Sequence, residues 1–264
     1  MQANIAGMTA LITGASSGLG TDFARQLAER GCNLVLVARR EDRLRQVTAE
    51  ITSKYGVTVD CITMDLAETG APKRLYDQLF GQGRAIDILI NNAGIGLFGE
   101  FTQNPWDTLH QMLELDMIAL TYLTHLFAPD MVKRGRGYIL LISSIGAFQP
   151  SPMYAAYSAA KSYVLSFGEA LHYELRKTAV RCTVLCPGVT RSEFLAVAGQ
   201  RTTFYQRMTM MDSPAAVRIG IGAMLKGRSS VVAGTFNTLF ALSTRLLPRQ
   251  VLAWLAAWAM KEPR

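Results

Sequence analysis

The alternation of two kinds of segment along the chain constrains its fold most. Between Met8 and Ala233, short apolar, β-branched runs alternate with longer segments of helical periodicity. This pattern is typical of βαβ units, in which helices connect parallel strands. It predicts an α/β protein with a doubly wound, seven-stranded parallel sheet and helices on both faces. We expect strands near residues 8–13, 33–38, 57–64, 86–91, 136–143, 180–186 and 229–233, and helices near 18–30, 41–54, 70–82, 105–134, 154–178 and 213–225.

The chain shows no sign of division into separate folding units. It has 264 residues, half of them apolar, and no linker or repeat interrupts the alternating pattern. A chain of this size can bury a substantial core as a single domain. We predict one catalytic domain over residues 1–233 and a helical extension over 234–264, which packs on the same domain or at an interface.

The cysteines and the N-terminus bear on the cellular location of the protein. The four cysteines show no paired spacing, so we expect neither a disulfide framework nor a metal site. The first strand pattern begins at Met8, which leaves no room for a secretory signal. Both features favour a reducing, cytoplasmic setting.

A glycine-rich turn follows the first expected strand. Residues 13–20 read Thr-Gly-Ala-Ser-Ser-Gly-Leu-Gly and open a helix. In parallel sheets, ligands bind outside the carboxyl ends of the strands. The free amides and dipole at a helix N-terminus attract phosphate, and glycines let it approach the backbone. The turn therefore predicts a phosphate site, although similar turns also occur for packing alone.

The end of the second strand indicates which dinucleotide would bind. An NAD enzyme presents an acid here to the ribose 2′-hydroxyl, whereas this chain has Arg39 and Arg40. An acid would repel a 2′-phosphate, and a guanidinium would pair with it. We therefore expect NADP(H), with Arg39 next to the phosphate. Arg40 is expected only to begin a solvated helix with Glu41 and Asp42.

A serine and a tyrosine–lysine pair form the candidate catalytic group. Ser144 follows the fifth strand, and Tyr157 and Lys161 come later, four residues apart on one expected helix face. A free tyrosine has a pKa near 10, and a nearby ammonium favours the phenolate. Ser144 can hold a substrate oxygen. We therefore expect Lys161 to lower the pKa of Tyr157 so that it exchanges a proton.

Two further motifs follow the fourth and sixth expected strands: Asn91-Asn92-Ala93-Gly94 and Pro187-Gly188. Together with the glycine-rich turn, Ser144 and the Tyr157–Lys161 pair, they resemble the short-chain dehydrogenase/reductase family, whose fold is Rossmann-like. The resemblance covers roughly residues 8–233. It implies that Tyr157 is the acid/base, that Ser144 orients the carbonyl, and that Lys161 also binds the nicotinamide ribose. The motifs that carry it are Thr13-Gly14-x-x-x-Gly18-x-Gly20, Asn91-Asn92-Ala93-Gly94, Ser144, Tyr157-x-x-x-Lys161 and Pro187-Gly188.

The resemblance also implies a cofactor site. Asp65 matches the acid beside the adenine, residues 91–94 the adenosine pocket, and residues 187–192 the stretch beside the nicotinamide. Arg39 matches the NADP-selecting position. The expected cofactor-binding residues are Gly14, Ser16, Ser17, Gly18, Leu19, Gly20, Arg39, Asp65, Asn91, Ala93, Gly94, Tyr157, Lys161, Pro187, Gly188, Val189, Thr190 and Ser192.

One catalytic position departs from the family pattern. The family has an Asn in the long helix before the fifth strand, and Asp116 aligns with it here. That Asn is thought to hold a water that connects the lysine to solvent. A carboxylate would pair with Lys161 and alter its effect on Tyr157. We expect retained activity with a shifted pH optimum.

Two apolar regions lie outside these motifs. Residues 190–213 stand where the family places its substrate loop, and they suit either a bulky apolar substrate or plain helix packing. Residues 201–264 contain nine Lys/Arg against two acids. An apolar stripe near the C-terminus favours core or dimer packing over contact with a membrane surface. It comprises Leu247, Val251, Trp254, Leu255 and Trp258.

The leading hypothesis is an NADP(H)-dependent oxidoreductase that interconverts a lipophilic carbonyl compound and a secondary alcohol. The substrate could be a 3-oxoacyl, steroid-like or xenobiotic carbonyl compound. The alternative is a catalytically impaired NADP-binding protein with a regulatory or interaction role. The resemblance implies a homodimer or homotetramer, and no sequence pattern supports nucleic-acid binding.

Overall fold

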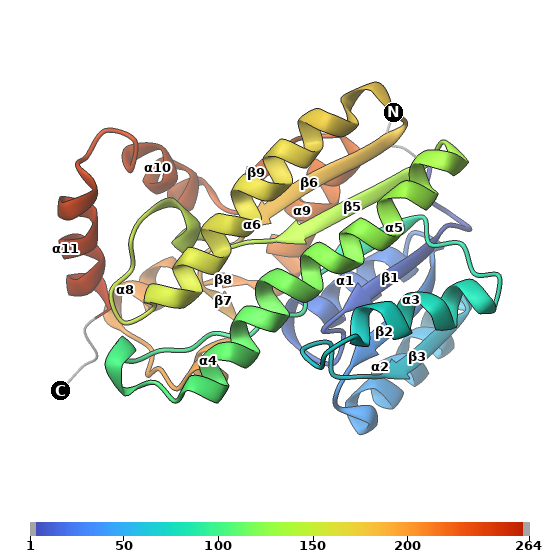
Figure 1. Ribbon diagram of the computed structural model, residues 1–264, viewed down its shortest axis with the longest axis horizontal. Helices are drawn as coiled ribbons and strands as arrows, with labels where there is room; N and C mark the ends of the chain where they lie inside the picture. The colour runs from blue at the N-terminus through green and yellow to red at the C-terminus, as the bar shows by residue number, and fades with distance from the viewer. Residues whose placement is uncertain (1–3, 261–264) are drawn as a thin grey trace.

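The predicted sheet is present. The computed structural model describes residues 4–260, apart from the side chains of Phe204, Tyr205 and Met208, so the outer ends of both predicted regions lie outside the described residues. Seven strands form one fully parallel sheet in the order β3-β2-β1-β4-β5-β6-β9 (Figure 1). They are β1 Thr9–Thr13, β2 Asn33–Ala38, β3 Val59–Thr63, β4 Ile88–Asn91, β5 Gly137–Ile142, β6 Val180–Cys186 and β9 Ser230–Val232.

The central strands are apolar throughout because helices cover both faces of the sheet. Leu11 of β1 aligns with Val35 of β2 on one side and with Leu89 of β4 on the other, and all three are fully buried. Continuous apolar strands are typical of parallel sheets covered on both faces. The chain adds β2 and β3 on one side of β1 and then β4 on its other side, so the strand order reverses between β1 and β4. A ligand crevice is expected at that point.

Two helical layers enclose the sheet. One core contains side chains of α1 (Gly18–Ala28), α2 (Glu41–Tyr55) and α9 (Ser213–Leu225). The other contains side chains of α3 (Ala71–Gly81), α5 (Leu120–Arg134) and α6 (Ala155–Glu174). The long helix expected over 105–134 is divided into α4 (Trp106–Leu113), a π-helical segment (Glu114–Ala119) and α5. Such π-helical turns often occur at functional sites, and this one contains Asp116.

The loop after β6 and the chain after β9 build one end of the molecule (Figure 1). The expected substrate loop contains two short paired strands, β7 (Thr190–Arg191) and β8 (Met211–Asp212), and two short helices, α7 (Phe194–Ala198) and α8 (Phe204–Thr209). Two further helices, α10 (Thr235–Ser243) and α11 (Arg249–Ala259), lie at the left end of the view in Figure 1. No helix within residues 4–260 is long and apolar enough to cross a bilayer.

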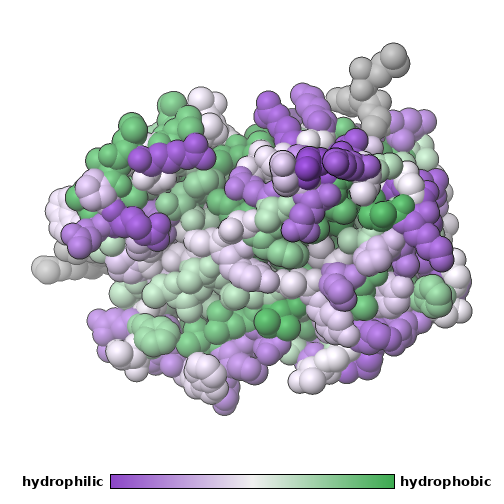
Figure 2. All heavy atoms as spheres, turned by 45° about the horizontal axis from the view of Figure 1, so that its top comes forward, coloured by the Kyte–Doolittle hydropathy of each residue, from purple (hydrophilic) through white to green (hydrophobic). Residues whose placement is uncertain are grey.

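The C-terminal stripe does not pack into the core of the chain. Trp254 and Trp258 are 68% and 66% exposed, and α11 instead buries Leu252 and Ala256. Core packing, one of the expected explanations of this stripe, is therefore wrong for its tryptophans. Figure 2 shows apolar surface gathered where α10 and α11 lie.

Candidate active site

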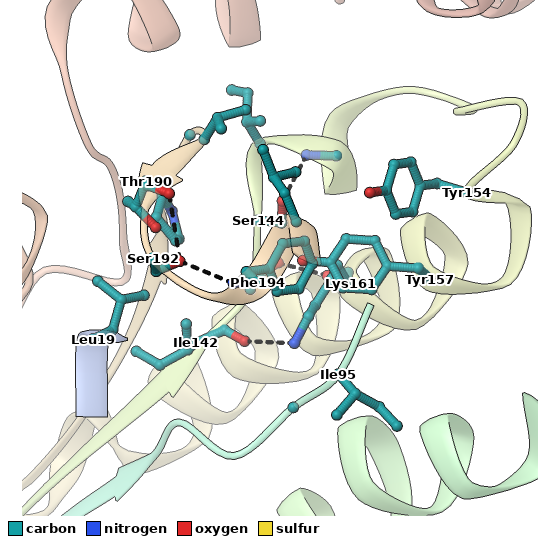
Figure 3. Close-up of a pocket in the computed structure, with 18 of the residues that line it drawn as sticks. Leu19, Ile95, Ile142, Ser144, Tyr154, Tyr157, Lys161, Thr190, Ser192 and Phe194 are labelled. Carbon is teal, nitrogen blue, oxygen red and sulfur yellow. Dashed lines mark hydrogen bonds between the residues drawn. The ribbon is translucent and has the colours of Figure 1, made fainter. Parts of the chain in front are cut away.

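A cavity of about 670 Å³ lies at the carboxyl ends of the strands. It extends from the glycine-rich turn after β1, past the ends of β4 and β5, to the loop after β6 and to α10 and α11. All of the predicted cofactor-binding residues line it except Gly20 and Asn91. The topology thus brings together groups that are far apart in the sequence (Figure 3).

The glycines of the turn allow close backbone packing. Gly14 has φ +68°, which favours glycine, and a Cβ there would lie 2.9 Å from Ala93 Cα. A Cβ on Gly20 would lie 2.1 Å from the carbonyl oxygen of Gly14, so α1 can start this close to the turn only with glycine. Ser17 precedes α1, and its side chain makes no capping hydrogen bond. The first amides of α1 therefore lie at the cavity without a side-chain cap. A phosphate fits such a helix end.

The segment after β4 is tied to this turn. Thr13 Oγ1 accepts hydrogen bonds from the amides of Asn92 and Ala93 at 3.0 and 2.9 Å. The Asn92 side chain donates to the carbonyl oxygen of Thr13 at 2.9 Å. Asn91, expected in the adenosine pocket, instead points away from the cavity and donates to Thr124 Oγ1 at 2.9 Å. Successive side chains of a strand face opposite ways, so Asn92 lines the cavity in its place.

Two arginines border the cavity where one was expected. Arg39 Nη1 lies 3.4 Å from Asp65 Oδ2. The residue expected beside the 2′-phosphate and the residue expected beside the adenine therefore lie together. Arg40 was expected only to begin α2, but it lines the cavity and lies 3.4 Å from Ser16 Oγ. Its guanidinium also pairs with Glu193 of the substrate loop at 3.0 Å. Sequence reasoning missed Arg40 because this partner is 153 residues away.

The three candidate catalytic side chains meet in this cavity. Lys161 Nζ lies 5.6 Å from the centre of the Tyr157 ring, and the Ser144 side chain is close enough to Tyr157 to lower its pKa. Ser144 Oγ is oriented by the amide of Gly146, which donates to it at 3.1 Å. Lys161 Nζ donates to the carbonyl oxygen of Ile142 at 3.2 Å (Figure 3). The end of β5 and one face of α6 supply the whole group.

Asp116 lies beneath this group as a fully buried partner of Lys161. Its Oδ2 is 2.9 Å from Lys161 Nζ, and its Oδ1 accepts a hydrogen bond from the amide of Ile95 at 2.9 Å. A Cβ on Gly94 would lie 3.0 Å from Asp116 Oδ1 and 3.2 Å from Lys161 Nζ, so glycine leaves room for the pair. The expected pairing of the two charges is present in the structure.

Burial and these charges set the acidity of the site. Burial raises the pKa of Tyr157, Lys161 opposes that rise, and Asp116 adds to it. The net direction is upward, so the expected lowering by Lys161 is outweighed here. Burial alone would lower the pKa of Lys161, but Asp116 and Tyr157 outweigh it and raise that pKa. Asp116 therefore favours the protonated forms of both Tyr157 and Lys161.

Aromatic side chains enclose Tyr157. The rings of Tyr154 and Phe194 lie 5.5 and 5.4 Å from its ring, centre to centre. Phe194 comes from the substrate loop and packs against Gly96, where a Cβ would lie 2.5 Å from the Phe194 ring. The loop thus covers the candidate catalytic tyrosine, and the burial of Tyr157 raises its pKa.

The part of the cavity that the C-terminal helices line is mostly apolar. Phe240, Leu247, Leu252 and Trp258 contribute to its lining. Gln149 also lines it, and its buried Oε1 accepts no hydrogen bond from the described part of the chain. Sequence reasoning did not single out Gln149, because nothing in its sequence context distinguishes it from any other loop glutamine.

A polar bridge ties the substrate loop to α6 and the C-terminus. Tyr154 Oη and Gln206 Nε2 donate to Gln200 Oε1 at 2.8 and 2.7 Å. Gln200 Nε2 lies 3.7 Å from the sulfur of Met260. The loop and the end of α11 therefore form one wall of the cavity.

Known proteins resemble this chain in sequence and fold. Residues 8–202 match the family model described as short chain dehydrogenase. An uncharacterized oxidoreductase of Myxococcus xanthus is 31% identical over 238 residues, 90% of either chain. The very-long-chain 3-oxoacyl-CoA reductase of Pyrenophora tritici-repentis is 37% identical over 178 residues, which are 66% of this chain and 52% of the relative. The structure of a short-chain dehydrogenase from Sphingobium yanoikuyae in complex with NADPH is 31% identical, with a TM-score of 0.81 over 90% of this chain and 94% of that one.

Proposed function

Because this chain belongs to the short-chain dehydrogenase/reductase family, we propose that it is an NADP(H)-dependent oxidoreductase that interconverts a lipophilic ketone and a secondary alcohol. The observation that carries the proposal is the meeting of Ser144, Tyr157 and Lys161 in one cavity with a phosphate-binding turn. The test is turnover of NADPH with ketones graded from small and polar to long and apolar.

The cavity fits NADP(H). The uncapped start of α1 and the glycines of the turn would hold the diphosphate, and Arg39 would pair with the 2′-phosphate. Asp65 would lie beside the adenine, and Lys161 would bind the nicotinamide ribose. When bound, the cofactor supplies or accepts the hydride. The NADPH complex of the relative from Sphingobium yanoikuyae supports this assignment.

The side chains of this chain supply the proton chemistry. In reduction, the Tyr157 hydroxyl donates its proton to the carbonyl oxygen as the alcohol forms, and Ser144 donates a hydrogen bond to the same oxygen. The ammonium of Lys161, held by Asp116 and Ile142, stabilises the phenolate that remains. Water then returns a proton to Tyr157. In oxidation, the phenolate accepts the proton of the alcohol.

The lining of the cavity supports a bulky, lipophilic substrate. Phe194, Leu252 and Trp258 present apolar surface. Gln149 offers a buried acceptor to one hydroxyl or amide of the substrate. The name of the Pyrenophora relative, a very-long-chain 3-oxoacyl-CoA reductase, agrees with a long acyl carbonyl compound as one candidate.

Replacing Arg39 by alanine is expected to lower kcat/KM for NADPH about 10- to 100-fold, since a hydrogen bond to a charged group contributes about 1.5–3 kcal/mol. Efficiency with NADH should change little, because NADH has no 2′-phosphate. Arg45→Ala is the matched control, since Arg45 is exposed on the same segment and pairs with Glu41. Steady-state kinetics with both cofactors test this. Equal efficiency of the wild type with NADPH and NADH would refute the role of Arg39.

A further inference from the structure

Most of the exposed surface of α10 and α11 has no role in the chemistry above, although Trp258 also lines the cavity. We propose that it docks onto an anionic lipid membrane surface, with the helices lying in the plane of the interface. We call it the C-terminal apolar face and define it by Leu239, Leu242, Leu246, Val251, Trp254 and Trp258. These side chains are between 41% and 85% exposed.

The composition of the face matches that of an interfacial helix. Trp254 and Trp258 are four residues apart and therefore share one side of α11. Figure 2 shows the apolar surface gathered at this end of the molecule. Contiguous apolar surface of this kind on a protein marks a contact site. Tryptophan and leucine beside arginine suit the boundary between lipid headgroups and acyl chains.

The basic residues near this face indicate what it binds. Residues 213–260 contain no Asp or Glu but five basic residues: Arg218, Lys226, Arg228, Arg245 and Arg249. Arg245 lies in the turn between α10 and α11, Arg249 is the first residue of α11, and both are exposed. A symmetric contact with a second copy would bring these like charges together. An anionic lipid surface instead offers them opposite charge.

The cavity is continuous with this face. Leu247, Leu255 and Trp258 are 40%, 38% and 66% exposed, and all three also line the cavity that contains Tyr157. Membrane docking would therefore set the mouth of the cavity against the lipid. If the proposed function holds, a lipophilic ketone dissolved in the bilayer reaches the site without crossing water.

Vesicle flotation of the full chain tests the docking. The wild type should float with phosphatidylcholine vesicles that contain phosphatidylglycerol, and binding should weaken as salt is added. Trp254→Ser/Trp258→Ser and Arg245→Glu/Arg249→Glu should each lower the partition coefficient about tenfold or more. The matched controls are Trp106→Ser, since Trp106 is also 66% exposed but lies on α4, and Lys133→Glu/Lys177→Glu. Both controls should bind like the wild type, and thermal melting checks that each variant is folded.

Three results would overturn the proposal. One is a wild type that does not float with the anionic vesicles. Another is equal binding to phosphatidylcholine alone, which would remove the role of charge. The third is a dimer in light scattering that Trp254→Ser/Trp258→Ser dissociates, because a second copy would then cover the face. Tyr157→Phe protein should bind vesicles like the wild type, so this test stands apart from the proposed catalysis.

Discussion

Tyr157→Phe is expected to lower kcat about 10²- to 10⁴-fold, the usual contribution of a positioned general acid. The variant loses only the phenolic hydroxyl, which lies near Ser144. Its ring keeps its packing against Tyr154 and Phe194, so the fold and the cofactor site should be preserved. NADPH affinity should therefore stay close to that of the wild type.

Kinetics and cofactor titration together test this prediction. Tyr163→Phe is the matched control, because Tyr163 lies on the same helix with its hydroxyl bonded to Thr121 at 2.8 Å, outside the catalytic group. It should keep nearly full activity. Substantial turnover by Tyr157→Phe would contradict the proposed proton donor. Loss of NADPH binding by that variant would show that the hydroxyl serves the cofactor site instead.

Replacing Asp116 by alanine is expected to lower the free energy of unfolding by about 3–5 kcal/mol, because it leaves the buried Lys161 without its counter-charge. Asp116→Asn should lower the free energy of unfolding less, since the amide oxygen of the new side chain can still accept the hydrogen bond from the amide of Ile95. Denaturant unfolding of the two variants measures the difference. Equal stability of Asp116→Ala and the wild type would show that the ion pair is not needed to hold Lys161.

Asp116→Asn is also expected to move the pH–rate profile to lower pH. Asp116 raises the pKa of both Tyr157 and Lys161, so its removal lowers both, whichever group loses its proton first. Oxidation needs the phenolate and should reach full rate at lower pH. Reduction needs the protonated tyrosine and should begin to fail at lower pH. An unchanged profile with unchanged turnover would mean that Asp116 does not tune the site.

The sheet and most of the site could be predicted because they depend on local patterns. The strand at 33–38 is set by its own apolar residues, and the spacing of Tyr157 and Lys161 places them on one helix face. The carboxyl ends of parallel strands all lie at the same end of the sheet. Gly14 and Ser144, which follow two such strands, therefore both line the cavity, as expected.

The remainder depends on tertiary contacts that no local pattern encodes. Arg40 lines the cavity because the substrate loop brings Glu193 to it. Asn91 turns away because strand side chains alternate, and a shift of one residue changes the face. The pKa of Tyr157 is raised because Phe194 and Tyr154 bury it. The exposure of Trp254 depends on which side of α11 meets the protein.

The proposed function is the reduction of lipophilic ketones with NADPH. The most direct measurement follows NADPH consumption by the purified chain with ketones of increasing chain length, together with the alcohol formed. We predict that one alcohol forms per NADPH consumed and that kcat/KM rises as the apolar part of the ketone lengthens. Tight NADPH binding without turnover of any carbonyl compound or alcohol, in either direction, would contradict it and identify a cofactor-binding protein that has lost catalysis.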